Sequence, residues 1–324
     1  MVRPMKDVMA DSDPALLDAR IRAAEAALAA HYGRTAVEHQ VRTAQGLDVR
    51  VVEFPAAEAS ADLPPIVLLH GIASVTAVAM PLVGALAARR ILAVDWPGHG
   101  LSDLSVLAPH SDLRAHAVSV LDAVLARFSI ERTDLVGHSL GGQFSLYFAL
   151  ARPEKVRRLV LLGAPGAGFG EVRPVMAVRA LAVPGLGNAI LGLSTSQAAY
   201  ERNFGRLFGK GALDGYPGEI MEIGHLASQR SDFAPSVASM FRALTAPFGV
   251  RPRVPVSHEE LARIATPVLM VWGDDDVLLN PAKGRPSFDA IPGAQLLEVK
   301  GGGAPWLDEP ERVAGAVSAF LDSP

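Results

Sequence analysis

The chain has 324 residues, 50% of them hydrophobic and 20% charged, and its formal net charge is −4. This apolar content excludes disorder as the dominant state, and the charge balance leaves no basic surplus for a nucleic-acid backbone. The sequence contains no cysteine, which excludes disulfides, thiolate catalysis and cysteine-ligated metal sites. We therefore expect a cytoplasmic protein with no nucleic-acid partner.

Two apolar segments, 77–94 and 176–193, raise the question of a membrane span, because the mean hydropathy is +0.26. Arginines interrupt both segments, and the second also contains proline and glycine. Neither is the unbroken stretch of about 20 apolar residues that crossing a bilayer requires. Charged residues near the N-terminus also argue against a secretory signal. We interpret 176–193 as an apolar surface segment or a pocket wall.

The first elements are a helix and a hairpin. Residues 14–31 predict a helix, with Asp13 as its N-cap and proline in its first turn. Residues 37–43 and 47–54 alternate apolar and polar side chains around a Gln-Gly turn, and this pattern predicts a β-hairpin.

From residue 66 onward, short apolar runs alternate with helical patterns. The predicted strands are 66–69, 91–94, 135–136, 156–162, 267–272 and 295–299. The predicted helices are 81–89, 111–128, 140–151, 281–290 and 309–321. Short continuous apolar runs are typical of strands buried on both faces, and their alternation with helices predicts a parallel sheet.

The interval 166–265 interrupts this alternation with glycines, prolines and short helical patches. We expect it to be an inserted helical lid. The predicted organisation is an N-terminal helical extension (1–36), an α/β core in two pieces (37–165 and 266–324) and the lid.

One motif in the core carries chemistry: Gly137, Ser139 and Gly141 fit Gly-x-Ser-x-Gly. A predicted strand precedes the motif and a predicted helix follows it, as in a nucleophile elbow, where the serine oxygen is exposed above the sheet. The N–H of Leu140 would then point to the same place as an oxyanion donor. The alternative is a glycine-rich turn whose serine only caps the helix.

With this motif in its context, the chain resembles proteins of the α/β-hydrolase fold that have a helical cap. The resemblance runs from about residue 37 to the C-terminus and implies a mostly parallel eight-stranded sheet flanked by helices. His-Gly at 70–71 resembles the family's oxyanion loop, in which Ile72 N–H would be the second donor. Residues 95–102, 272–276 and 305–311 resemble the family's Asp-x-x-Gly-x-Gly-x-Ser turn, acid-bearing strand end and post-histidine segment.

The resemblance also narrows the reaction. Serine at 139 argues against haloalkane dehalogenase and epoxide hydrolase chemistry, which uses a carboxylate nucleophile. It fits an esterase, a thioesterase, a carbon–carbon hydrolase or a cofactor-free perhydrolase. The apolar side chains of 166–265 favour an apolar small-molecule substrate or ligand. No cofactor and no metal is predicted, and the oligomeric state is left open.

Three adjacent aspartates compete for the role of catalytic acid. The family spacing Gly-x-x-Asp selects Asp276 over Asp274 and Asp275. Its role would be to hold the histidine in the correct tautomer. The alternative is that all three belong to a solvated turn.

The catalytic histidine is missing. The family order places it after the acid, but the last of the nine histidines is His258. Gly303 stands where the resemblance expects histidine. A serine hydroxyl needs an adjacent base, and removing that base in a serine protease costs on the order of 10⁶ in rate. The chain is therefore predicted to be hydrolytically impaired.

Three explanations remain open. The histidine was replaced in the laboratory, or the protein naturally lost hydrolysis and became a ligand-binding protein or a non-hydrolytic enzyme such as a cyclase or lyase. In the third, another histidine substitutes, and His225 is the best placed in sequence. His70, His99 and His138 are predicted to be structural histidines that bond to the backbone.

Overall fold

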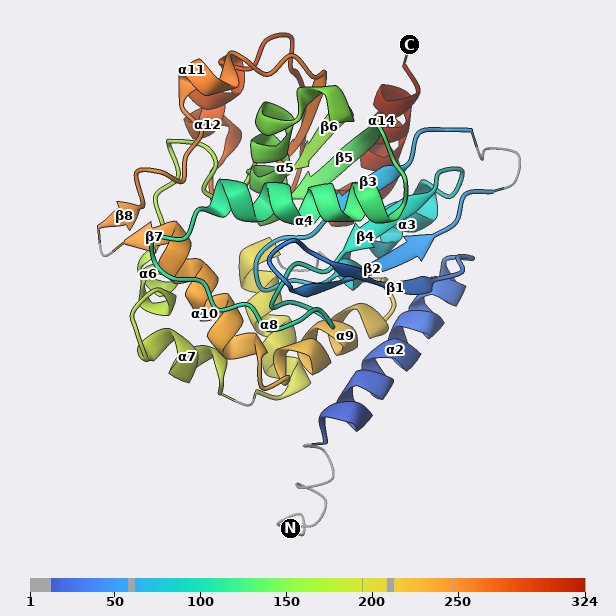
Figure 1. Cartoon of the computed structure of the whole chain (residues 1–324), viewed down its shortest axis with the longest axis vertical. Helices are drawn as coiled ribbons and strands as arrows, with labels where there is room; N and C mark the ends of the chain where they lie inside the picture. Colours follow the sequence, from blue (N-terminus) through green and yellow to red (C-terminus); the bar gives the residue numbers. More distant parts are fainter. Residues whose placement is uncertain (1–12, 58–61, 194, 209–212, 247, 324) are drawn as a thin grey trace.

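A mixed eight-stranded sheet forms the centre of the molecule (Figure 1), as the sequence predicts. The computed structural model describes residues 13–57, 62–193, 195–208, 213–246 and 248–323. In spatial order the strands are β1 (Val37–Arg42), β2 (Asp48–Phe54), β4 (Ile91–Val94), β3 (Ile66–Leu69), β5 (Thr133–His138), β6 (Val156–Leu162), β9 (Val268–Gly273) and β10 (Gln295–Val299).

The antiparallel part of the sheet is at one edge, where β2 lies between β1 and β4 and runs opposite to both. β1 pairs with β2 as the predicted hairpin, and β2 pairs antiparallel with β4. All the other neighbours are parallel, from β4–β3 to β9–β10. The carboxyl ends of the parallel strands therefore meet at one edge, where ligands bind in open α/β sheets.

The parallel strands are apolar because both faces of the sheet are covered. On β3, Ile66 and Leu68 join one buried cluster, whereas Val67 and Leu69 join the other. Helices α2, α3, α9 and α14 contribute to the first cluster, and α4, α5 and α12 contribute to the second. Side chains alternate across a strand, so a continuous apolar run fills both layers.

The helices agree with the predicted ranges to within a few residues, with one larger difference. Those of the core are α2 (Pro14–His31), α3 (Met80–Ala85), α4 (Leu113–Arg127), α5 (Leu140–Ala151), α12 (Pro281–Asp289), α13 (Pro305–Asp308) and α14 (Pro310–Asp322). The predicted helix 81–89 is wrong at its end, because α3 stops at Ala85. Arg89 instead leaves the helix and binds the buried Asp134 carboxylate at 3.1 Å.

Between β6 and β9 the described chain is mainly helical. It forms α6 (Met176–Leu181), α7 (Leu186–Leu191), α8 (Gln197–Phe208), α9 (Glu219–Ser228), α10 (Phe233–Leu244) and α11 (His258–Leu261). A small hairpin of β7 (Thr245–Ala246) and β8 (Gly249–Val250) was not predicted, since two residues per strand carry no readable pattern. Figure 1 shows α6 to α10 gathered at one end of the molecule, away from α14.

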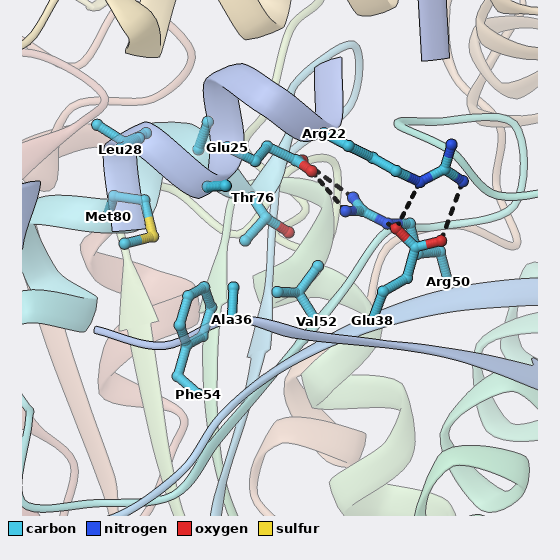
Figure 2. Close-up of a pocket in the computed structure, with 12 residues that line it drawn as sticks. Arg22, Glu25, Leu28, Ala36, Glu38, Arg50, Val52, Phe54, Thr76 and Met80 are labelled. Atoms are coloured by element: carbon cyan, nitrogen blue, oxygen red, sulfur yellow. Dashed lines mark hydrogen bonds and ion pairs between the residues drawn. The ribbon is translucent and has the colours of Figure 1, made fainter. Parts of the chain in front are cut away.

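Buried charges attach α2 to the sheet. Arg50 of β2 binds Glu25 of α2, Glu38 of β1 and Asp95 after β4. Burial alone would raise the pKa of Asp95, but the Arg50 guanidinium holds it below its usual value. Figure 2 shows Glu25, Glu38 and Arg50 beside a cavity of about 180 Å³ whose remaining wall is mostly apolar. Asp18 of α2 also pairs with Arg230, between α9 and α10, so α2 joins the sheet to the helical segment.

Candidate active site

Ser139 lies at the turn from β5 into α5, at the carboxyl edge of the sheet. Its φ of 49° is unusual for a residue other than glycine, and such strain is concentrated at functional sites. The side chain is half-buried. The flanking glycines have a steric reason: a Cβ on Gly141 would lie 2.2 Å from the Leu69 carbonyl oxygen, and one on Gly137 would lie 2.6 Å from Gly141 O. The turn is therefore tight enough that neither position accepts a side chain.

The loop after β3 lies against this serine. A Cβ on Gly71 would be 3.1 Å from the Cβ of Ser139. Within the described structure, neither Ile72 N–H nor Leu140 N–H donates a backbone hydrogen bond. Both predicted oxyanion donors therefore have no backbone acceptor among the described residues.

Two buried histidines hold this loop in place. His70 Nδ1 donates to Gly71 O at 2.7 Å and its Nε2 accepts from Trp96 N–H at 3.2 Å. His99 Nε2 accepts from Ala73 N–H at 3.0 Å. Burial lowers the pKa of both histidines, that of His99 to about 3. The prediction that both histidines bond to the backbone is confirmed.

Among the three adjacent aspartates, only Asp276 is buried. Its Oδ2 accepts from Ala164 N–H at 2.9 Å and its Oδ1 accepts from Leu278 N–H at 2.9 Å. Burial raises its pKa, and these backbone donors oppose the rise. A buried carboxylate fixed by backbone donors suits the role of orienting acid better than a solvated turn.

The other two aspartates have different surroundings. Asp274 binds the ammonium group of Lys300 at 2.5 Å and accepts from Gly301 N–H at 3.1 Å. Asp275 is exposed. Asp274 thus connects the loops after β9 and β10, and neither residue has the fixed, buried position of Asp276.

The backbone of Gly303 lies between the acid and the serine turn. A Cβ on Gly163 would be 2.7 Å from Gly303 O and 3.2 Å from Asp276 Oδ2, so these two oxygens are neighbours. Gly303 O also accepts a 3.0 Å hydrogen bond from Nε2 of His138, the residue before Ser139. The Gly303 carbonyl therefore lies near the Asp276 carboxylate and is bonded to the residue that precedes Ser139, and position 303 has no side chain.

His138 takes part in this geometry through its hydrogen bond to the Gly303 backbone. Because Nε2 must carry the proton that it donates to Gly303 O, the neutral ring has an unprotonated Nδ1. Burial lowers the pKa of His138 to about 4, which keeps the ring neutral at pH 7. The prediction that His138 bonds to the backbone is confirmed.

His225 lies elsewhere. It is on α9, where Nε2 is 2.7 Å from the carbonyl oxygen of Thr195 and 3.0 Å from the side-chain amide of Gln229. These partners all belong to the helical segment between β6 and β9. The structure gives it no hydrogen bond to Ser139 or Asp276 in the part of the chain that is described.

Sequence reasoning missed two contributors to the site. Ala164 supplies a backbone donor to Asp276, and Gly163, with φ of 68°, lets the chain pass close to Gly303. The only sign of this close approach in the sequence is a glycine directly after the apolar run 156–162. Nothing in the pattern shows which distant carboxylate a backbone N–H will meet.

No group of three or more histidine, aspartate or glutamate side chains in the described ranges could hold a metal ion. Likewise, none of the described helices has both the length and the apolar character needed to cross a bilayer. The cavity in Figure 2 includes none of the predicted site residues in its lining.

The buried histidines predict a loss of stability in mild acid. Burial lowers the pKa of His116 and His138 to about 4 and that of His99 to about 3, whereas unfolded histidine titrates near about 6.5. As the pH falls below about 6.5, these histidines bind protons in the unfolded chain but stay neutral in the folded chain. The free energy of unfolding should fall by up to about 1.4 kcal/mol per pH unit for each histidine.

Urea unfolding between pH 7 and pH 5 measures this slope. His116 is the best probe, because its Nε2 is buried without a hydrogen-bond partner in the described structure. His116→Leu should reduce the slope by about one proton, whereas the exposed His110, changed to leucine, should not. Equal slopes for the two variants would contradict the prediction.

The sheet order, the strained serine turn and the carboxyl-edge loops define an α/β-hydrolase fold. The chain belongs to the alpha/beta hydrolase family, because the sequence model of that family matches residues 66–316.

Its relatives include hydrolases. The chain is 31% identical over 245 residues to a 2-hydroxymuconate semialdehyde hydrolase of Pseudomonas putida, covering 72% of this chain and 77% of that protein. It is 30% identical over 270 residues to an uncharacterised protein of Mycobacterium tuberculosis, covering 80% and 76%.

Two solved structures share the fold. A carboxylesterase of Bacillus subtilis superposes with a TM-score of 0.73 at 22% identity, covering 94% of this chain and 98% of the other. A 2-hydroxy-6-oxo-6-phenylhexa-2,4-dienoate hydrolase of a Rhodococcus species also reaches 0.73, at 19% identity, covering 90% and 100%.

Proposed function

We propose that this chain has the site of a serine-nucleophile hydrolase that acts on an ester, thioester or carbon–carbon bond of an apolar small molecule. In this proposal the position of its catalytic base is vacant. The observation that carries the proposal is the location of Gly303. Its carbonyl oxygen lies beside Asp276 and accepts a hydrogen bond from the residue before Ser139. In this proposal Ser139, Asp276 and the two N–H donors would form the rest of the hydrolase site, and position 303 would be the place of the missing imidazole.

The proposed roles follow from this arrangement. Ser139 Oγ would attack the substrate carbonyl, and the N–H groups of Leu140 and Ile72 would stabilise the oxyanion. Asp276 would orient a base at position 303. Without that base, no group accepts the serine proton and no acid protonates the leaving group. Both the attack by serine and the departure of the leaving group are therefore slow.

We also propose that the helices between β6 and β9 act as a lid over the substrate. Ile72, a proposed oxyanion donor, packs against Phe233, Val237 and Phe241 of α10. The names of the relatives support hydrolysis of small molecules. The apolar side chains above the site favour an apolar substrate.

The unchanged chain should turn over p-nitrophenyl butyrate at a rate close to background. Ser139→Ala should lower that rate by less than about tenfold, because members of a triad act as a unit and the base is already absent. Ser318→Ala, on α14, is the matched control, and a fluorophosphonate probe tests slow labelling of Ser139 in parallel.

Efficient turnover that Ser139→Ala abolishes would contradict the vacant-base proposal and would point to a substitute base, with His225→Gln as the next variant. A chain that neither turns over esters nor reacts with the probe, yet binds an apolar ligand, would instead favour a binding protein.

A further inference from the structure

The cavity of Figure 2 lies between helix α2 and the outer strands of the sheet, with a volume of about 180 Å³. Protein interiors are close-packed, and voids larger than a water molecule are few. None of Ser139, Asp276 and Gly303 is in its lining. A void of this size, apart from the proposed catalytic residues, is a candidate binding site for a second molecule.

One wall of the cavity is apolar. The side chains that form it are Leu28, Val52, Phe54, Ala77 and Met80. Each of these residues is at most 4% exposed. An apolar cavity of about 150 Å³ is large enough to hold benzene. This wall therefore fits the ring or the short hydrocarbon body of a small organic molecule.

The opposite wall carries charge. Arg50 donates to both carboxylate oxygens of Glu25 and to one oxygen of Glu38. Arg22 donates to both oxygens of Glu38, and Figure 2 shows the two acids bonded to the same Arg50 guanidinium. Arg50 also binds Asp95, which does not line the cavity, at 3.0 Å. In this group two guanidiniums therefore face three carboxylates.

The neighbouring titratable groups do not supply the missing positive charge. Burial lowers the pKa of His70, which lies near Asp95, so its ring is neutral at pH 7. Asp18 pairs with Arg230 and adds no positive charge. Arg34 donates to three backbone carbonyl groups, and burial lowers its pKa with no carboxylate opposing that change. The described side chains at the charged wall thus retain one net negative charge.

Glu25 is the lining carboxylate with the weaker compensation. Burial raises the pKa of Glu25, and Arg50, which opposes this rise, is shared with Glu38 and Asp95. Burial also acts on Glu38, but Arg22 and Arg50 together hold its pKa below the usual value. A positive charge in the cavity would stabilise the ionised form of Glu25.

The lining reaches the molecular surface at two alanines. Ala26 of α2 and Ala36, directly before β1, line the cavity and are exposed. An entrance bordered by such small side chains admits a small molecule without a change in the fold. A larger side chain at either position would narrow the entrance.

We propose that this cavity binds a small organic cation, with its ammonium group beside Glu25 and Glu38 and its apolar body against Phe54 and Met80. Benzylamine has this form, since it is one ring with one short arm that is charged at pH 7. This binding does not depend on the chemistry of Ser139.

Isothermal titration calorimetry of the full chain with benzylamine tests the proposal. Benzylamine should bind at least about tenfold more tightly than benzyl alcohol, its uncharged analogue, because the net charge of the cavity attracts the ammonium group. Benzoate, the analogue of opposite charge, should not bind. Cyclohexylamine should bind as a second cation with an apolar body.

Two variants of one ion pair test the sign of the charge. Glu38→Gln and Arg22→Gln both remove the Arg22–Glu38 ion pair, but they change the net charge of the cavity in opposite directions. Glu38→Gln should weaken benzylamine binding by at least about threefold, whereas Arg22→Gln should strengthen it by at least about threefold.

Two neighbouring alanines test the location. Ala26→Leu, at the entrance, should weaken benzylamine binding by at least about tenfold. Ala27→Leu is the matched control, because Ala27 is exposed on the same helix and does not line the cavity, and it should bind as the unchanged chain does. Circular dichroism melts show that each variant is folded.

Three results would overturn the proposal: no binding of benzylamine or cyclohexylamine, equal effects of Ala26→Leu and Ala27→Leu, or stronger binding by Glu38→Gln than by Arg22→Gln. Ser139→Ala should bind benzylamine as the unchanged chain does, so failure of this site and failure of the proposed hydrolase are separate results.

Discussion

Replacing Gly303 with histidine should raise ester turnover by at least about 10³-fold and by as much as about 10⁶-fold. In the proposed site the imidazole would supply the missing base, because the Gly303 carbonyl lies near Asp276 Oδ2 and is bonded to the residue before Ser139. Gly303 is not among the glycines with positive φ, so its backbone conformation does not by itself exclude a side chain. The measurement is kcat/KM for p-nitrophenyl butyrate.

Two controls make this result specific. Ser139→Ala in the Gly303→His background should abolish the gain, because the imidazole has no other nucleophile to activate. Gly302→His adds the same residue one position earlier and should give no gain. If the ester turnover of Gly303→His is no higher than that of Gly302→His, the site lacks more than its catalytic base. The esterase interpretation would then be wrong, and the next step would be to identify a bound ligand.

Gly141→Ala should cost at least about 3 kcal/mol in the free energy of unfolding or prevent folding altogether. An alanine Cβ at 141 would lie 2.2 Å from Leu69 O and 2.8 Å from Leu69 Cβ. Relief would require moving α5 away from β3 at the centre of the sheet. Such a shift would also displace Ser139, so activity of the Gly303→His background should fall with stability.

Gly315→Ala on α14 is the matched control, because a Cβ there meets nothing within 4 Å. It should stabilise the protein by up to about 1 kcal/mol, the usual gain for alanine over glycine within a helix. Urea denaturation measures both variants. Similar free energies of unfolding for Gly141→Ala and Gly315→Ala would show that α5 is not in close contact with β3 at Gly141.

Much of the fold was predictable because local pattern and burial agree in the core. The strands 66–69, 91–94, 156–162 and 295–299 occur at the predicted residues, and in the first three an apolar run is buried by layers on both faces. The helix at 14–31 also agrees to the residue, with the Asp13 side chain accepting from Ala15 N–H. The end of α3 was missed because the long-range pairing of Arg89 with Asp134 leaves no local signal.

The candidate site was predictable where a spacing rule exists. The motif around Ser139 has a steric cause in Gly137 and Gly141, and the motif reads directly from the sequence. Asp276 followed from a family spacing, and its burial beside Ala164 gives that choice a physical basis. The hydrogen bond from His138 to Gly303 O could not be predicted, because it joins residues 165 positions apart through the sheet edge.

A comparison of two aspartates in the Gly303→His background tests whether position 303 is the place of a catalytic base. Asp276→Asn should lower kcat/KM by about 10³- to 10⁴-fold, because the new imidazole would lose the partner that fixes its tautomer. The exposed neighbour Asp275, changed to asparagine in the same background, should change kcat/KM by less than about threefold. Equal effects of the two substitutions would contradict the claim that Gly303 occupies a base position between Asp276 and Ser139.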